Sequence, residues 1–95
     1  MKILVIGAGA WGTALAASAA LSQHHVSLWA RDSKLVTELR LARVNARYLP
    51  GVALPAALQL LDADSLPLLQ ATVGQDLIIL ATPISAARSM LQALQ

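Results

Sequence analysis

The sequence predicts an α/β protein with a doubly wound parallel sheet, and three observations lead to this prediction. Short apolar runs alternate with longer segments of helical character along the chain. Apolar residues make up 57% of the 95 residues and charged residues only 13%, as expected where strands are covered on both faces. A Gly-x-Gly-x-x-Gly pattern directly follows the first run. Strands that alternate with helices form a parallel sheet with right-handed crossovers.

Eight elements are predicted in chain order. The strands are expected at residues 2–6, 26–30, 58–61 and 77–81, and the helices at 11–21, from 33 to a break at 48–51, at 66–72 and at 86–94. Asp32 or Ser33 can cap the second helix and Ser65 the third, because their side-chain oxygens accept N–H groups of a first turn. Residues 48–55 are expected to form an ordered loop, since Pro50 cannot continue a helix.

Composition narrows the classes of function. A net charge of +2, with two tryptophans and one tyrosine, offers little for a nucleic acid to bind. Arg40, Arg43 and Arg47 lie close together and are interpreted as a solvated helix face more readily than as a basic binding patch. The chain has no cysteine, which excludes disulfides, thiolate metal sites and a cysteine nucleophile, and no metal site is expected. No apolar stretch reaches the roughly 18 residues that span a bilayer.

The amino-terminal segment has a second interpretation. Met1-Lys2, an apolar run and Ala17-Ser18-Ala19 resemble a secretory signal with its cleavage site. The three glycines and Trp11 inside that run argue against a signal, and a chain without cysteine fits a reducing cytoplasm. We therefore expect a cytoplasmic protein.

The glycine pattern is the strongest indication of function. Gly7, Gly9 and Gly12 follow a predicted strand and open a predicted helix, and a second strand completes a unit of about 30 residues. In this setting Gly7 makes the tight turn, Gly9 lets the backbone approach a pyrophosphate, and Gly12 permits close packing of helix and strand. The helix N-terminus then faces the anion with its free N–H groups. The pattern predicts a Rossmann-like domain that binds a dinucleotide.

The residues after the second strand bear on the choice of dinucleotide. An NAD enzyme usually places a carboxylate there, which accepts a hydrogen bond from the ribose 2′-OH. The first charged residue here is Arg31, whose forked donors suit a 2′-phosphate and favour NADP. Asp32 lies about 20 residues after Gly12, the spacing of an NAD-type acid, but it can also serve as a helix cap. NADP is therefore favoured, and NAD stays open.

Two aromatic positions and a histidine pair have more than one interpretation. Trp11 inside the glycine pattern either walls the nicotinamide side of the cleft or fills a gap above the strand ends. His24 and His25 are expected in a turn at the end of the sheet away from the ligand, as solvated residues and not as ligands or bases.

At this point the residues resemble one family, the NAD(P)-dependent glycerol-3-phosphate dehydrogenases of bacterial type. The matching segments are residues 7–16, 26–31, 45–51, 54–55 and 76–83. The Asn45-x-x-Tyr48-Leu49-Pro50-Gly51 segment is much more specific than the glycine pattern, which many dehydrogenases share. The resemblance covers the whole chain in the right order. It implies reduction of dihydroxyacetone phosphate to sn-glycerol 3-phosphate with NADPH or NADH, which feeds phospholipid synthesis.

The resemblance also implies roles for particular residues. Ala10 and Trp11 match the family's cofactor contacts in the glycine loop, although many members have serine in place of Ala10, so only backbone donation remains there. Arg31 matches the residue that binds the phosphate of the adenine ribose. Tyr48 matches a wall of the cofactor cleft, and Pro83 is taken as a further cofactor-binding residue.

Catalytic residues are not expected in this chain. In the family, the lysines that polarise the substrate carbonyl and bind its phosphate come later, and neither Lys2 nor Lys34 matches them. The resemblance therefore implies that residues 1–95 are a cofactor domain, truncated before its helical substrate domain. A small phosphorylated substrate and a homodimer are candidate partners of the full-length form. The alternative is a free-standing module that senses NAD(H) or NADP(H) and signals through a protein partner.

Overall fold

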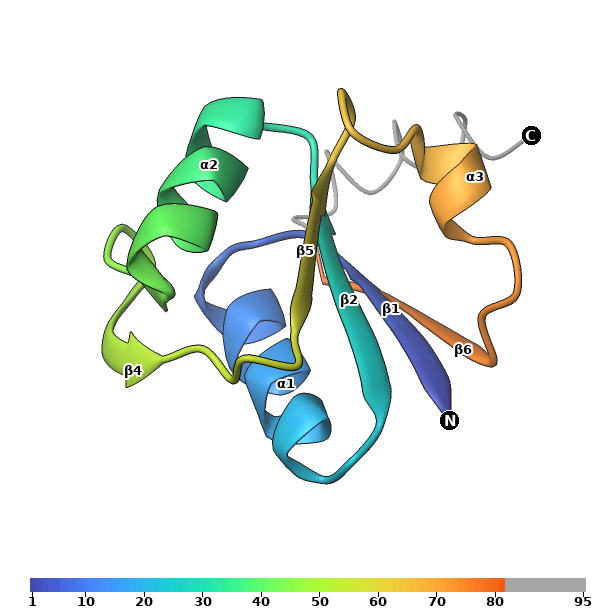
Figure 1. Ribbon diagram of the computed structural model, residues 1–95, viewed down its shortest axis with the longest axis horizontal. Helices are drawn as coiled ribbons and strands as arrows, with labels where there is room; N and C mark the ends of the chain where they lie inside the picture. The colour runs from blue at the N-terminus through green and yellow to red at the C-terminus, as the bar shows by residue number, and fades with distance from the viewer. Residues whose placement is uncertain (82–95) are drawn as a thin grey trace.

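The computed structural model describes residues 1–81, in which four strands form a parallel sheet and two more form a small antiparallel pair. The elements are β1 (Lys2–Ile6), α1 (Ala10–Leu21), β2 (His25–Ala30), α2 (Ser33–Ala42), β3 (Val44–Asn45), β4 (Leu49–Ala53), β5 (Gln59–Asp62), α3 (Leu68–Ala71) and β6 (Leu77–Leu80). The main sheet has the order β5-β2-β1-β6, and all three of its neighbouring pairs are parallel (Figure 1). The predicted α/β fold is thus confirmed, and the predicted helix at 86–94 lies outside the described residues.

Helices cover both faces of the sheet. α1 and α2 lie on one side and α3 on the other (Figure 1). Successive side chains of a strand point to opposite faces, so Ile3 and Val5 join the core under α1 and α2, whereas Leu4 and Ile6 join the core under α3. A continuously apolar strand is therefore what a doubly covered sheet requires.

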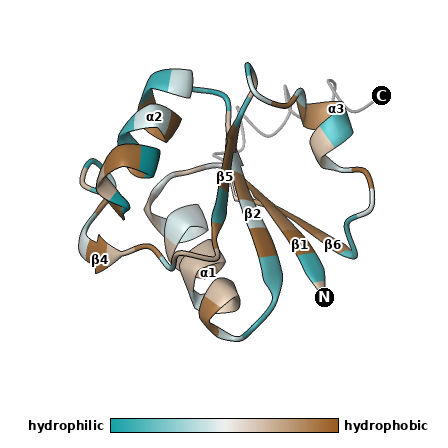
Figure 2. Ribbon diagram, viewed as in Figure 1, coloured by the Kyte–Doolittle hydropathy of each residue, from teal (hydrophilic) through white to brown (hydrophobic). Residues whose placement is uncertain are grey.

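The sheet has an apolar middle and a polar amino edge. In Figure 2 the strands are hydrophobic over most of their length and turn hydrophilic where β1 and β2 begin. Lys2 and His25 are paired at this edge, and His24 lies in the preceding turn. The predicted placement of the two histidines, away from the glycine loop, is confirmed.

The second predicted helix is shorter than the sequence indicated. α2 ends at Ala42, and Arg43 follows in the left-handed conformation with φ of 54°. The segment expected to be a loop contains a hairpin instead, in which β3 pairs with β4 across an irregular register. A contact between distant residues explains the hairpin. The Leu54 N–H donates to the Arg43 carbonyl at 2.7 Å and so joins the far end of the hairpin to the end of α2.

The third predicted helix is also shorter, and Ser65 does not cap it. α3 begins at Leu68 with Pro67 as its N-cap residue. Ser65 instead forms a closed turn with Asp62, in which the Ser65 N–H donates to Asp62 Oδ1 at 2.7 Å and the Asp62 N–H donates to Ser65 Oγ at 3.1 Å. Leu66, which precedes a proline, is disfavoured in the helical conformation, so the helix cannot begin earlier.

Candidate dinucleotide-binding site

The glycine loop lies at the carboxyl edge of the parallel sheet, between β1 and α1. Gly7 N–H donates to the Trp29 carbonyl of β2 at 2.8 Å, and Ala81 N–H, just after β6, donates to the Ile6 carbonyl at 2.8 Å. The loop is therefore held between the ends of two strands that flank β1. In open α/β sheets this edge is where ligands bind.

The three glycines meet three different geometric demands. Gly7 has φ of 114°, which L side chains rarely adopt, and so makes the tight turn. A Cβ on Gly12 would lie 2.0 Å from the Gly7 carbonyl oxygen, so only glycine allows α1 to approach the loop this closely. A Cβ on Gly9 would meet nothing within 4 Å. The protein itself leaves the space beside Gly9 open, as the approach of a pyrophosphate requires.

The N-terminus of α1 offers unpaired donors to that open space. The first intrahelical bond runs from Thr13 N–H to the Gly9 carbonyl at 3.0 Å, and no side chain caps the helix. The N–H groups that precede it have no acceptor within an α-helix, and the helix dipole adds positive potential at the same end. Ala10 and Trp11 open this first turn, and Ala10 supplies only a backbone donor to an anion. The arrangement suits a pyrophosphate.

Asn45 connects the glycine loop to the hairpin and was not singled out as a site residue. Its side chain is fully buried and donates from Nδ2 to the Ala8 carbonyl at 2.9 Å and to Thr13 Oγ1 at 2.8 Å. Its Oδ1 accepts from the Tyr48 N–H at 3.2 Å. Sequence reasoning placed Asn45 in the dehydrogenase-like loop, but no local signal shows that its partners lie more than 30 residues earlier.

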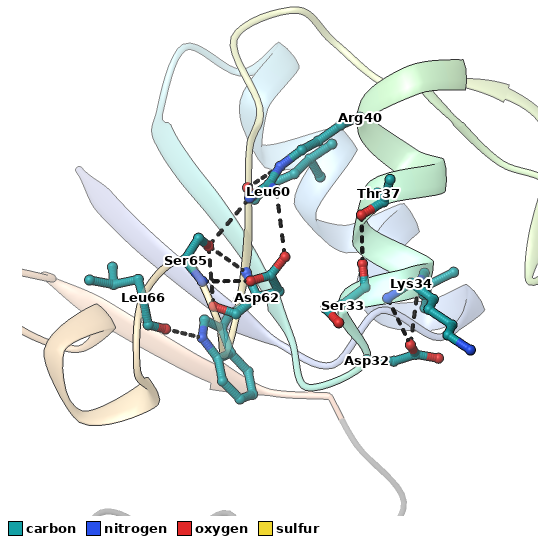
Figure 3. A network of polar contacts seen from close by, with 11 residues as sticks. Asp32, Ser33, Lys34, Thr37, Arg40, Leu60, Asp62, Ser65 and Leu66 are labelled. Atoms are coloured by element: carbon teal, nitrogen blue, oxygen red, sulfur yellow. Dashed lines mark hydrogen bonds and ion pairs between the residues drawn. The ribbon is translucent and has the colours of Figure 1, made fainter.

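Arg31 and Asp32 follow directly after the carboxyl end of β2, and Asp32 makes contacts with both of its carboxylate oxygens. Asp32 Oδ1 caps α2 by accepting from Lys34 N–H at 3.0 Å and Leu35 N–H at 3.3 Å (Figure 3). Asp32 Oδ2 lies 3.6 Å from Arg47 Nη1. The prediction that Asp32 or Ser33 caps α2 is confirmed for Asp32. Arg31 is exposed beside it at the end of the strand.

The remaining predicted site residues lie at different distances from the glycine loop. Trp11 is 63% exposed in the first turn of α1, so the interpretation that it fills a gap in the fold is wrong. Tyr48 is 47% exposed in the hairpin turn, and its backbone is tied to the loop through Asn45. Pro83 lies outside the described residues. The structure therefore gathers Gly7, Gly9, Ala10, Trp11 and Gly12 at one turn, with Arg31 and Tyr48 on neighbouring elements.

The three clustered arginines make contacts within the fold; Arg40 and Arg47 are exposed, as a solvated surface requires, but only Arg40 lies on the helix, which ends at Ala42. Arg40 on α2 donates to the Leu60 carbonyl of β5 at 2.8 Å (Figure 3). Arg43 donates to the carbonyls of Pro55 and Leu58. Arg47 pairs with Glu38 at 3.2 Å. Each guanidinium satisfies backbone or carboxylate acceptors, so none of them is a dedicated anion site.

Asp62 at the end of β5 is the buried charge of this network. Its side chain is 6% exposed and lies 3.5 Å from Arg40 Nη1. The Ser65 backbone N–H holds the pKa of Asp62 below its usual value of 3.8, against the opposing effect of burial, and the Ser65 hydroxyl and Arg40 add to the lowering. Asp62 is therefore an ionised structural group that joins β5, α2 and the turn before α3.

A cavity away from the glycine loop lies at the other end of the sheet. Its volume is about 670 Å³, and its lining residues, among them Lys2, His25 and Gln75, come from the amino edge of the sheet. Because the glycine loop is at the opposite edge, this hollow is not part of the candidate site. Within residues 1–81 no cluster of histidine and acidic residues could hold a metal, and no helix is long and apolar enough to cross a membrane.

Comparison with known sequences gives the family. The family described as NAD-dependent glycerol-3-phosphate dehydrogenase N-terminus matches residues 2–95. A glycerol-3-phosphate dehydrogenase [NAD(P)+] of Polaromonas sp. (strain JS666) is 56% identical and matches 100% of this chain but 30% of its own length. The corresponding protein of Thiobacillus denitrificans is 52% identical over 99% of this chain and 27% of its own length. The chain thus spans less than a third of these relatives.

A solved structure agrees on the fold. The crystal structure of glycerol-3-phosphate dehydrogenase from Coxiella burnetii superposes with a TM-score of 0.65 at 22% identity, covering 97% of this chain and 36% of that one. This likeness supports the Rossmann-like arrangement of the strands and helices. The family match extends over nearly every residue, and the chain therefore belongs to the N-terminal domains of the NAD-dependent glycerol-3-phosphate dehydrogenases.

Proposed function

We propose that this chain is the cofactor-binding domain of an NAD(P)-dependent oxidoreductase that reduces dihydroxyacetone phosphate to sn-glycerol 3-phosphate, a precursor of glycerophospholipids. One observation carries the binding role. The N-terminus of α1 is uncapped and faces the space that Gly9 leaves open. An anion seated there satisfies N–H groups that nothing in the helix can satisfy. The names of the relatives, which are glycerol-3-phosphate dehydrogenases, support glycerol 3-phosphate as one of the two reactants.

The residues of the chain bind and orient the dinucleotide in this proposal. The first-turn N–H groups of α1 hold the pyrophosphate, and Tyr48 and the exposed Trp11 bound the cleft on its two sides. Pro83 is the further contact proposed from the sequence. When bound, the reduced nicotinamide supplies the hydride that converts the ketone to an alcohol. A proton donor for the ketone oxygen is still required.

NADP is the dinucleotide we favour. Both oxygens of Asp32 are committed, one as the cap of α2 and the other to Arg47, which leaves this carboxylate poorly placed to accept from a ribose 2′-OH. Arg31 stands exposed at the same strand end. A guanidinium beside a 2′-phosphate gains charge-assisted hydrogen bonds that NAD cannot provide.

The proton donor belongs to the part of the protein outside this chain. The chain has two lysines, and Lys2 begins β1 at the amino edge, whereas Lys34 lies in the first turn of α2. Asp62 is bound into the turn after β5, where its side chain accepts the Ser65 N–H at 2.7 Å. We therefore expect the chain alone to bind cofactor without turning over substrate.

Titration of the 95-residue chain with NADPH and NADH, followed by nicotinamide fluorescence, tests the binding role and the preference together. We expect NADPH to bind more tightly, and Arg31→Ala to weaken NADPH by about tenfold while leaving NADH unchanged, because one charged hydrogen-bonding partner is lost. Asp32→Asn is the matched variant, because it can keep the cap and should leave the affinity for NADH unchanged. Tighter binding of NADH, weakened by Asp32→Asn and unaffected by Arg31→Ala, would contradict the NADP assignment.

A second experiment tests the expectation that the chain binds cofactor without turning over substrate. The chain, incubated with NADPH and dihydroxyacetone phosphate, should show no loss of nicotinamide absorbance above a protein-free control. Measurable turnover would show that the catalytic groups lie within residues 1–95. A longer open reading frame after Gln95 favours the dehydrogenase, whereas a native stop codon there favours the free-standing sensing module.

A further inference from the structure

We propose that Asn45 is the positioning residue that orients the glycine loop for the pyrophosphate, which rests on the dinucleotide-binding role proposed above. The residue lies in β3, outside the glycine pattern, and does not face the open space itself. It acts through the backbone of Ala8 and the side chain of Thr13. It also ties the hairpin that carries Tyr48 to the same point.

The Asn45 amide forms hydrogen bonds with three segments of the chain, and both of its donors are used. Its two Nδ2 hydrogens go to the Ala8 carbonyl at 2.9 Å and to Thr13 Oγ1 at 2.8 Å. Its Oδ1 accepts the Tyr48 N–H at 3.2 Å. Asn45 and Thr13 are both 0% exposed, so water cannot replace a lost partner at little cost. The amide thus fixes loop, helix and hairpin to one another.

The bond to Ala8 determines where the next N–H group points. The peptide between Ala8 and Gly9 is planar and trans, since no cis peptide bond occurs in the described residues, so its C=O and N–H point in opposite directions. Asn45 holds the carbonyl towards the buried side. The Gly9 N–H is thereby directed away from the core, on the side where a Cβ at Gly9 would meet nothing within 4 Å.

Only an amide fits this position. Aspartate has the same shape and keeps an acceptor for the Tyr48 N–H, and the Thr13 hydroxyl can turn to donate to it, but it brings an oxygen against the Ala8 carbonyl, where a donor is needed. The carbonyl is then repelled, and the peptide between Ala8 and Gly9 loses its fixed orientation. The ribose end of the site, at Arg31, makes no contact with Asn45 in these hydrogen bonds and should be unaffected.

The experiment compares two ligands in the 95-residue chain. NADPH contains the pyrophosphate, whereas 2′-AMP presents the adenosine ribose phosphate without it. We expect Asn45→Asp to raise the Kd for NADPH by about tenfold or more, the usual consequence of an unsatisfied buried group, and to leave the Kd for 2′-AMP unchanged. Thr13→Val, which removes only the hydroxyl acceptor, should act in the same direction, and Thr13→Ser should restore wild-type binding.

Far-UV circular dichroism and hydrogen exchange separate positioning from stability. Each variant is compared with wild type at a temperature where it is folded. If Asn45 only stabilised the fold, its substitution would lower the melting temperature and leave the Kd values for NADPH and 2′-AMP unchanged. Folded Asn45→Asp and Thr13→Val chains with wild-type affinity for NADPH would overturn the role of Asn45 while leaving the proposed function intact. A wild-type chain that binds neither NADPH nor NADH would overturn the proposed function.

Hydrogen exchange tests the positioning without a ligand. Faster amide exchange at Ala8 and Gly9 in unliganded Asn45→Asp would support the positioning role of Asn45, and unchanged exchange would refute it.

Discussion

At the scale of single residues, the glycines of the loop differ in whether the fold has room for a side chain. Gly9 and Gly12 belong to the same pattern, yet a Cβ added to Gly12 meets the Gly7 carbonyl at 2.0 Å and one added to Gly9 meets nothing within 4 Å. Gly12 is therefore required by the protein, whereas Gly9 is required only by a ligand. The backbone of Gly9, with φ of −72°, is open to any residue.

This contrast gives a paired prediction. Gly12→Ala should destabilise the folded chain by about 1–3 kcal/mol, because a forced contact must push α1 away from the loop. Gly9→Ala should leave the free energy of unfolding within about 1 kcal/mol of wild type and weaken NADPH binding, because the new methyl group occupies the space that a pyrophosphate needs. Urea unfolding and NADPH titration measure the two effects. Equal stability losses in both variants would contradict the distinction.

At the level of elements, α2 is shorter than periodicity suggested, and side chains near its end bind to distant segments of the chain. Arg43 leaves the helical conformation, and its guanidinium reaches the carbonyls of Pro55 and Leu58. Arg40 and Asp62 join α2 to β5 in the same way (Figure 3). These contacts span up to 22 residues of chain, and together they hold the hairpin that contains Asn45.

The Asp62 network should make stability depend on acid pH. The pKa of Asp62 is lower in the folded chain than its usual 3.8, chiefly through the Ser65 N–H, so the stabilisation is complete above that value and is lost as the pH falls through the folded pKa. Asp62→Asn can keep an acceptor for Ser65 but carries no charge. The difference in free energy of unfolding between wild type and Asp62→Asn should therefore shrink between about pH 5 and about pH 2.

Urea unfolding across this pH range measures the difference, with Asp64→Asn as the matched control. Asp64 is an exposed carboxylate two residues away, so its substitution changes the net charge equally without touching the Arg40 contact. A difference for Asp62→Asn that is constant with pH would show that the charge of Asp62 does not contribute to folding.

For the whole molecule, the two cores share the same strands. β1 and β2 send alternate side chains to the faces covered by α1 with α2 and by α3, and Trp29 of β2 belongs to the α3 face (Figure 1). Its indole Nε1 donates to the Leu66 carbonyl at 2.8 Å. Neither core can be lost without breaking the strands that hold the other, so the described elements should unfold together.

Tryptophan fluorescence can test this cooperation. Trp29 is 2% exposed and Trp11 is 63% exposed, so Trp11→Phe leaves one buried tryptophan as a reporter of the α3 face. Its fluorescence transition in urea should coincide with the far-UV circular dichroism transition, which reports mainly on α1 and α2. Trp29→Phe is the control, whose remaining emission should change little on unfolding. Two separated transitions in Trp11→Phe would show that the faces unfold independently.

The sequence by itself determined the features that depend on neighbouring residues. The four strands of the main sheet with the helices between them, the burial of β1 and β2 on both faces, the glycine turn and the Asp32 cap all follow from local pattern and local hydrogen bonds. The apolar run of β6 was expected to be buried as well, but Leu77 and Ile78 are exposed. The family also followed from sequence motifs, chiefly the segment from Asn45 to Gly51. Local chemistry is enough here because parallel strands and helix termini impose the same demands in any protein.

Only the tertiary structure decided the surroundings and partners of several individual side chains. The exposed indole of Trp11, the bracing arginines, the Ser65 turn and the buried amide of Asn45 depend on partners that are distant in the chain or on a turn that competes with a helix. A donor side chain binds the acceptor that folding brings within about 3 Å. The periodicity of the sequence does not predict which acceptor that is. The glycine loop could thus be predicted from its sequence, but not the residue that holds it in place.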